Sequence, residues 1–332
     1  MAILYNTPMS NIWKTLKKPF TVLAPMDDVT DDVFRNIVCE TARPDLFFTE
    51  FTNVEAICSA GRESQIRRFQ YSNRQHPIIA QIWGKEPKHY FETTKLIHEL
   101  GFDGVDINMG CPVRDVFQNG TCSAFIQDHS RAKEVISATQ EAAGEIPVSV
   151  KTRIGVNKIE IEDWIGFLLE QHLEAITIHG RTVKELSKVP CHWDEIGKAV
   201  MLRNTMQKDK HTMIVGNGDV KNYKEALSIY EAHGVDGVMI GRGIFENLWA
   251  FEKTPYVQQR SPQERLSLLL KHARLFETTW GITKRFEILK KFFKMYCSGF
   301  PDAQELRIKL METGNAEEIK CTLQEAGFII ES

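Results

Sequence analysis

The stretch TMIVGNGDVKNYKEALSIYEAHGVDGVMIGRGI, residues 212–244, holds two short apolar runs on either side of a segment with helical spacing. Both runs contain valine and isoleucine without a charged residue, as is typical of strands that are covered on both faces. The segment between them, 222–234, carries its charges on one face and ends in glycine, as helices commonly do. A strand, a helix and a second strand in this order predict a parallel βαβ unit.

The same alternation extends over most of the chain, and helical patterns separate most of the apolar runs. Further strands are predicted at 20–26, 45–52, 77–84, 104–110, 147–155 and 175–181. Eight strands that alternate with helices predict an α/β fold of the (β/α)8 TIM-barrel type. The competing fold, a doubly wound open sheet, needs a glycine-rich loop after its first strand. The first strand here ends in APMDDVT, residues 24–30, which contains no glycine.

The β-type runs stop after residue 255, and helical patterns follow at 261–281, 283–299 and 316–327. We therefore expect a barrel domain over residues 1–255 and a smaller all-helical C-terminal domain over residues 256–332. The apolar and charged fractions, 42% and 26%, are ordinary for a soluble protein, and the net charge is -3. No apolar run is long enough for a bilayer, and the seven cysteines lack a disulfide-framework spacing. These features predict a cytoplasmic protein with free thiols.

In a barrel of this type, the residues at the carboxyl ends of the strands converge on one site. The loops GNGDV (216–220) and IGRG (240–243) end the last two predicted strands. Either loop alone could simply make a tight turn. Together with Arg242 they favour a phosphorylated ligand, because glycine N–H groups and a guanidinium bind phosphate well. Gln81, Lys151 and His179 each have an ordinary structural role available, but their arrival at the same rim indicates a site.

A cysteine in GVDINMGCPVRDV, residues 104–116, has an unusual setting. Cys111 lies between Gly110 and Pro112, and proline holds both itself and the preceding residue in restricted conformations. A thiol presented so rigidly at a strand end can act as a nucleophile or as a general acid. We expect the more remote cysteines to be small buried apolar residues, namely Cys39, Cys58, Cys297 and Cys321.

At these motifs the chain resembles the tRNA-dihydrouridine synthases, flavin enzymes with a barrel and a C-terminal helical domain. The resemblance is carried by LAPMDDVTDDVFR, AQIWGKEP, GVDINMGCPVRDVFQNGTCSAFI, PVSVKTRIG, ITIHGRT, IVGNGDV, GVMIGRGIF and LKKFFKMYCSGFPDAQELR, in the order of the family. One segment departs from the family pattern, KELSKVPCHWDEI at 184–196.

The resemblance implies reduction of the C5–C6 double bond of specific uridines in tRNA. Hydride would come from FMN, which NADPH re-reduces, and the proton from Cys111. The implied FMN contacts are Pro25, Met26, Asp27, Gln81, Lys151, His179, Asn217, Gly218, Asp219, Gly241 and Arg242. Asn108 and Arg181 would face the substrate, and Lys290 and Lys291 of the helical domain would bind tRNA phosphates. We expect a monomer without a metal and without a membrane partner.

Two other functions stay open at this stage. An FMN-dependent dehydrogenase of free pyrimidines, of the dihydroorotate type, shares the barrel and can use a catalytic cysteine. A non-catalytic RNA-binding barrel protein would leave the glycine loops and Lys151 without a use.

Overall fold

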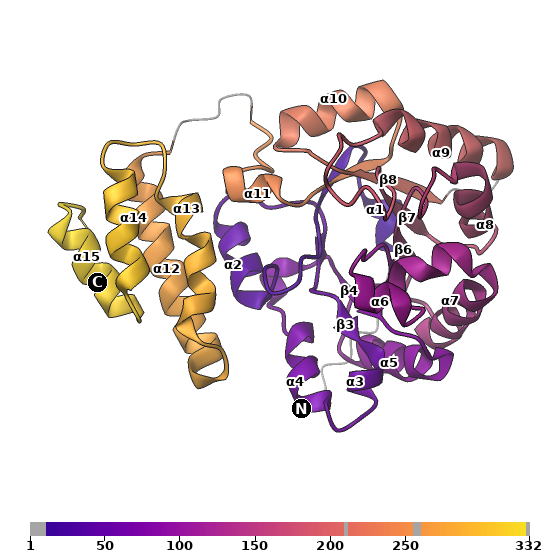
Figure 1. Cartoon of the computed structure of the whole chain (residues 1–332), viewed down its shortest axis with the longest axis horizontal. Helices are drawn as coiled ribbons and strands as arrows, with labels where there is room; N and C mark the ends of the chain where they lie inside the picture. Colours follow the sequence, from indigo (N-terminus) through magenta and orange to yellow (C-terminus); the bar gives the residue numbers. More distant parts are fainter. Residues whose placement is uncertain (1–10, 209–211, 255–259, 330–332) are drawn as a thin grey trace.

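The computed structural model describes residues 11–208, 212–254 and 260–329. A barrel of strands and helices lies beside a smaller helical module, which is drawn in yellow in Figure 1. The predicted domain boundary, between residues 255 and 256, lies outside the described residues. Within the described ranges, no helix is long and apolar enough to cross a membrane.

The strands form one parallel sheet that curves into a barrel. They pair in the order β1-β9-β8-β7-β6-β5-β4-β2. The short strand β3 follows β2 and pairs with the same neighbour, β4, so β2 and β3 together fill one position of the barrel. A parallel bridge between Val22 and Leu46 brings the two ends of this order together. The predicted eight-position barrel is therefore confirmed. The strands are β1 (Phe20–Leu23), β2 (Phe47–Phe48), β3 (Thr52–Asn53), β4 (Ile78–Trp83), β5 (Gly104–Met109), β6 (Val148–Arg153), β7 (Ala175–His179), β8 (Met213–Asn217) and β9 (Gly237–Ile240).

Helices accompany this barrel, and most of them cover its outside (Figure 1). They are α1 (Ile12–Thr15), α2 (Asp32–Glu40), α3 (Val54–Ile57), α4 (Arg62–Ile66), α5 (Pro87–Glu99), α6 (Arg114–Gln118), α7 (His129–Ala143), α8 (Gly166–Leu169), α9 (Trp193–Met206), α10 (Tyr223–His233) and α11 (Gly243–Glu246). A π turn, Ile161–Ile165, precedes α8.

The interior of the barrel changes character along its axis. Trp13 of α1 packs with Phe20, Val22 and Met239 in a small apolar core. Further toward the carboxyl ends of the strands, the buried interior side chains are polar: Gln81, Asp106, Ser149 and Thr177. Because buried polar groups are retained only where they are bonded or used, this end of the barrel is the place to look for a site.

The helical module consists of α12 (Pro262–Trp280), α13 (Phe293–Tyr296), α14 (Ala303–Glu312) and α15 (Ala316–Glu325). It packs on the barrel through α12 and α2, and Phe292 stacks on Phe34 with ring centroids 5.1 Å apart. The predicted helix at 283–299 is confirmed in part: Phe293–Tyr296 is α-helical, whereas Phe286–Phe292 is a 3₁₀ helix. Its apolar residues Phe286, Leu289 and Phe292 are three apart, a spacing that shares one face in a 3₁₀ helix.

Candidate functional site

A cavity of about 520 Å³ opens at the carboxyl ends of the barrel strands. Its walls contain most of the residues that the sequence assigns to a cofactor. They are Pro25, Met26, Lys151, His179, Asn217, Gly218, Asp219, Gly241 and Arg242, with Arg181 beside them. Asp27, Gln81, Asn108 and Cys111 lie outside this lining.

The loops after β8 and β9 form one end of the cavity. A Cβ on Gly243 would lie 2.2 Å from the carbonyl oxygen of Val220, so only glycine lets the two loops approach so closely. Gly241 lines the cavity, and a Cβ there would be in ordinary contact with Ala24 Cβ at 3.5 Å. Bare backbone therefore borders the cavity here, in the arrangement that suits a phosphate group. We refer to this end, formed by residues 217–220 and 241–243, as the cradle.

Two arginines share one carboxylate at the cradle. Arg181 is buried and donates through Nη2 to Asp219 and through Nε to the carbonyl oxygen of Val189 at 2.6 Å. The other oxygen of Asp219 lies 3.6 Å from Nη2 of Arg242, whose side chain is 66% exposed. Asp219 is thus neutralised by its neighbours, and Arg242 keeps donors for an anion.

The segment that departs from the family pattern packs beneath the cradle. The backbone N–H of Cys191 donates to Asp219 at 3.1 Å, and that of His192 donates to the carbonyl oxygen of Gly180 at 2.7 Å. A Cβ on Gly218 would lie 2.5 Å from the sulfur of Cys191. Burial raises the pKa of Cys191 to about 12, so this thiol is a neutral packing group.

The inner wall of the cavity carries a lysine and a histidine with shifted pKa values. Lys151 donates to Asn217 Oδ1 at 3.2 Å, and burial lowers its pKa to about 8. Burial and the nearby cations, Lys151 first among them, lower the pKa of His179 to about 2. Its Nε2 lies 3.1 Å from Nη1 of Arg181, and because a guanidinium only donates, the proton of the neutral ring is on Nδ1.

The Cys111 turn is anchored by its backbone. The N–H of Cys111 donates to Asn108 Oδ1 at 3.1 Å, and its carbonyl oxygen accepts from Ser123 Oγ at 2.6 Å. Arg153 donates through Nε to the carbonyl oxygen of Gly110 at 2.8 Å. The half-buried thiol is therefore held at a fixed place on the same rim as the cradle.

A second thiol tunes the first. A hydrogen bond from Cys122 lowers the pKa of Cys111 to about 7, although burial acts in the opposite direction. Cys122 is fully buried and its own pKa is raised by that burial, so it is the donor of the pair. The sequence places Cys122 near this loop, but only the fold brings it to the sulfur of Cys111. The sequence alone could identify Arg153 as a residue of the site, because Arg153 follows Lys151 by two residues and so shares its face of β6.

The remote cysteines differ from the expectation. Cys297 is buried as predicted, but Cys39 is half-buried, and Cys58 and Cys321 are exposed. Cys321 lies on α15, whose buried residues Ala316, Ile319 and Leu323 form the opposite face of the helix.

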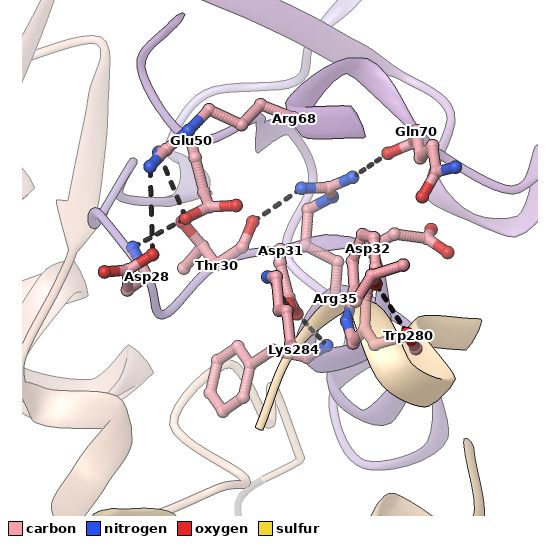
Figure 2. Close-up of polar contacts among 12 residues, drawn as sticks. Asp28, Thr30, Asp31, Asp32, Arg35, Glu50, Arg68, Gln70, Trp280 and Lys284 are labelled. Atoms are coloured by element: carbon pink, nitrogen blue, oxygen red, sulfur yellow. Dashed lines mark hydrogen bonds and ion pairs between the residues drawn. The ribbon is translucent and has the colours of Figure 1, made fainter. Parts of the chain in front are cut away.

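Beside the cavity, the loop after β1 is held by ion pairs (Figure 2). Arg68 lies 2.5 Å from Asp27 and 3.3 Å from Glu50, and Glu50 accepts from the N–H of Asp28 at 2.6 Å. These three carboxylates are close enough to share a cation, and the guanidinium of Arg68 is the cation that accompanies them. Asp27 therefore faces Arg68 and not the cavity.

The helical module reaches the same loop. Lys284 pairs with Asp31 at 2.8 Å (Figure 2) and lies over the ring of Trp280. Lys291 donates to the carbonyl oxygen of Asp28, whereas Lys290 donates to that of Met311, 2.8 Å away within the module. The two lysines predicted to bind tRNA thus have protein partners, and Lys291 lies at the mouth of the barrel.

A glycine-lined cradle, a neutral histidine and a rigidly held thiol lie together at the mouth of a parallel barrel, where enzymes of this fold have their active sites. The family model described as "Dihydrouridine synthase (Dus)" matches residues 22–329, and the chain belongs to this family. Its relatives include a "Probable tRNA-dihydrouridine synthase" of Staphylococcus aureus strain Mu50, 44% identical over 95% of both chains. A "Probable tRNA-dihydrouridine synthase 2" of Bacillus subtilis strain 168 is 43% identical over 95% of this chain and 96% of its own.

Two solved structures show a weaker likeness. Morphinone reductase in complex with tetrahydroNAD aligns over 70% of this chain and 85% of its own, at 12% identity and a TM-score of 0.47. The old yellow enzyme homologue from Zymomonas mobilis aligns over 72% and 90%, at 14% identity and a TM-score of 0.45. Neither likeness bears on what this chain does.

Proposed function

We propose that this chain reduces the C5–C6 double bond of uridines in tRNA to give dihydrouridine. Membership of the dihydrouridine synthase family implies a flavin, and we identify it as FMN, with NADPH as the reductant. The observation that supports this best is the placing of the Cys111 turn and the cradle on one rim of the barrel, after β5 and after β8 and β9. A proton donor and a phosphorylated cofactor can therefore meet the same substrate.

The residues present fit FMN. Bare backbone at Gly241 and the exposed donors of Arg242 suit its phosphate, and Lys151 puts a positive charge on the inner wall, which favours an electron-rich ring. When bound, FMN supplies the hydride for C6 of the uracil ring. Gln81, on β4, is separated by β5 from Lys151 on β6 and joins this set, whereas Asp27 holds Arg68 in place.

Cys111 supplies the proton for C5 of the uracil ring. Because the pKa of Cys111 is about 7, a large share of the thiol is protonated at neutral pH, and the thiol gives up its proton more readily than an ordinary cysteine. The thiolate left behind is stabilised by the hydrogen bond from Cys122 and by the charge of Arg153. The rigid turn fixes this acid relative to one carbon of one base, which is why proline and glycine flank it.

The substrate base has to leave the tRNA fold to enter such a pocket. Asn108 and Arg181 face the entering nucleoside, and Lys290 and Lys291 meet phosphates of the tRNA with their remaining N–H groups. We propose that the enzyme works as a monomer in the cytoplasm, without a metal.

The test is an anaerobic reoxidation experiment with the flavin-loaded protein. After reduction of the flavin, its absorbance is followed on addition of bulk tRNA from cells that lack this enzyme, with uracil and orotate in parallel. Fast reoxidation by tRNA alone supports the proposal, and dihydrouridine in the recovered tRNA identifies the product. Reoxidation by free pyrimidines alone would assign a dehydrogenase of nucleotide metabolism instead. A protein that holds no flavin but binds tRNA would be the non-catalytic alternative.

A further inference from the structure

A chain of hydrogen bonds runs from the centre of the barrel to the Cys111 turn. Ser149 Oγ donates to Asp106 Oδ1 at 2.6 Å, and Gln81 Nε2 donates to Asp106 Oδ2 at 2.7 Å. Asn108 Nδ2 then donates to Gln81 Oε1 at 3.1 Å. Finally, Asn108 Oδ1 accepts the N–H of Cys111, and also that of Gly110 at 3.0 Å. Three neighbouring strands, β4, β5 and β6, contribute to it.

Burial makes this chain unusually rigid. Asp106 and Gln81 are fully buried and Asn108 is 6% exposed, so water does not compete for their hydrogen bonds. Leaving one of these groups without its partner would carry the full desolvation penalty of a buried polar atom.

The direction of every bond in the chain is fixed from both ends. An ionised carboxylate only accepts, so Gln81 has to turn its NH₂ group toward Asp106 and its oxygen toward Asn108. At the other end, the backbone N–H groups of residues 110 and 111 only donate, so Asn108 has to turn its oxygen toward them. Both requirements agree, and each amide keeps one N–H that the chain does not use.

The buried carboxylate of Asp106 also feels the positive charge of Lys151. Burial raises the pKa of Asp106 to about 6, and the hydrogen bonds from Ser149 and Gln81 and the charge of Lys151 oppose that rise. The group is therefore mainly ionised at neutral pH, as the direction of the chain requires. Its position two residues before Asn108 puts both side chains on the inner face of β5.

We propose that Asp106 is a positioning residue: acting through Gln81 and Asn108, it fixes the Cys111 turn and sets which way both amides point. The proposal rests on the proposed function in that Cys111 is taken as the proton donor. In this arrangement of hydrogen bonds, Asn108 offers the substrate an N–H donor and no acceptor. Such a donor suits a carbonyl oxygen of uracil and disfavours the amino group that cytosine carries at C4.

Three variants of the full-length, flavin-loaded protein test this role. Asp106→Leu removes the acceptor on which the chain depends. Asp106→Asn keeps the shape and can keep the direction, because its oxygen accepts from Gln81 and its NH₂ donates to Ser149 Oγ. The matched control is Thr94→Val, since Thr94 is a buried residue of α5, outside the barrel interior, whose hydroxyl has no partner within the part of the chain that the structure describes.

The first readout is the rate of tRNA reduction per bound flavin. We expect Asp106→Leu to lower kcat by about 10- to 100-fold, the usual effect of leaving a buried polar group unpaired, with the flavin content unchanged. Asp106→Asn should recover most of the loss, and Thr94→Val should behave as wild type. Combining Asp106→Leu with Asn108→Ala should cost no more than the worse single change, because the two residues act as a unit.

The second readout is the pH dependence of Cys111 alkylation by iodoacetamide, followed by mass spectrometry of the peptide. We expect Asp106→Leu to move the midpoint to higher pH, because a loosened turn loses the hydrogen bond from Cys122. If Asp106→Leu does not fold, Gln81→Met breaks the chain one link further along and should give the same shift.

Wild-type kcat in Asp106→Leu, or an unmoved alkylation midpoint, would overturn the inference. A loss in Asp106→Asn as large as in Asp106→Leu would also overturn it, since the charge and not the direction of the chain would then matter. Failure of the proposed function looks different: wild-type protein would itself be inert toward tRNA, while the alkylation midpoints would still report on the chain.

Discussion

The two sides of the barrel mouth hold their functional groups by different means. On the side of β8 and β9, bare glycine backbone and two arginines surround one carboxylate, Asp219. On the side of β4 and β5, neutral amides form a chain that ends on the turn of Cys111. The first arrangement attracts an anion and the second fixes a reacting group. Substitutions should therefore separate the two sides, affecting either retention of the cofactor or turnover.

The largest effect should come from Cys111→Ala. Because this change removes the proton donor and leaves the cradle intact, we expect turnover to fall by about 1,000-fold with an unchanged flavin content. Single-turnover reoxidation by tRNA and the flavin-to-protein absorbance ratio measure the two quantities. Cys321→Ala, at an exposed thiol on α15, is the control and should match wild type. Near-normal turnover in Cys111→Ala would remove the thiol from the mechanism.

Arg242→Ala should give the opposite result. Loss of a charge-assisted hydrogen bond predicts flavin binding that is about 10- to 100-fold weaker, while turnover per bound flavin stays near wild type. Equilibrium dialysis against free FMN measures the affinity. The control is Lys224→Ala, an exposed residue of α10. Unchanged affinity in Arg242→Ala would mean that the cradle binds its anion through backbone alone.

The two sides were also unequally visible in the sequence. The cradle could be predicted because glycine loops, strand ends and Arg242 are all local in the chain. The position of Cys111 was visible for the same reason, in the turn between Gly110 and Pro112. Asp106 was detectable in principle, since a charge at the centre of an apolar strand has to be bonded or used, and Asn108 shares its face.

What the sequence could not supply are contacts that depend on how distant segments meet. Cys122 approaches Cys111 from a separate turn of the chain, in which the backbone of Cys122 is left-handed with φ 52°. The partners of Lys290 and Lys291 follow from the docking of the helical module and from its 3₁₀ segment, both of which the charge pattern alone leaves open.

Cys122→Ala should change the pH dependence and leave the rate near its maximum little altered. Cys111 has to be protonated to donate, so wild-type turnover should fall as the pH rises through about 7. Without the hydrogen bond from Cys122, the pKa of Cys111 rises and the decline moves to higher pH. The ratio of turnover at pH 8.5 to that at pH 6.5 should then increase by about tenfold.

Cys122→Ser is the matched control for that prediction. Its hydroxyl can donate to the sulfur of Cys111 as the thiol does, so its pH profile should stay close to wild type. Identical pH profiles for the alanine variant and wild type would show that Cys122 does not set the pKa of Cys111. Cys122 would then contribute only as a buried packing residue.

The smallest effect should come from Lys291→Glu. Lys291 lies at the loop after β1, between the two sides of the barrel mouth. If Lys291 meets a tRNA phosphate, reversing its charge should weaken tRNA binding about fivefold at low salt and less at high salt, because counterions screen the contact. Filter binding over a salt series measures this, with Lys294→Glu, at an exposed lysine three residues on, as the comparison.

The hydrogen bond from Lys291 to the carbonyl oxygen of Asp28 offers a competing explanation, in which Lys291 holds the helical module against the barrel. If Lys291 has that structural role, Lys291→Glu would weaken tRNA binding equally at every salt concentration and lower the melting temperature. The tRNA contact would then have to come from the neighbouring lysines.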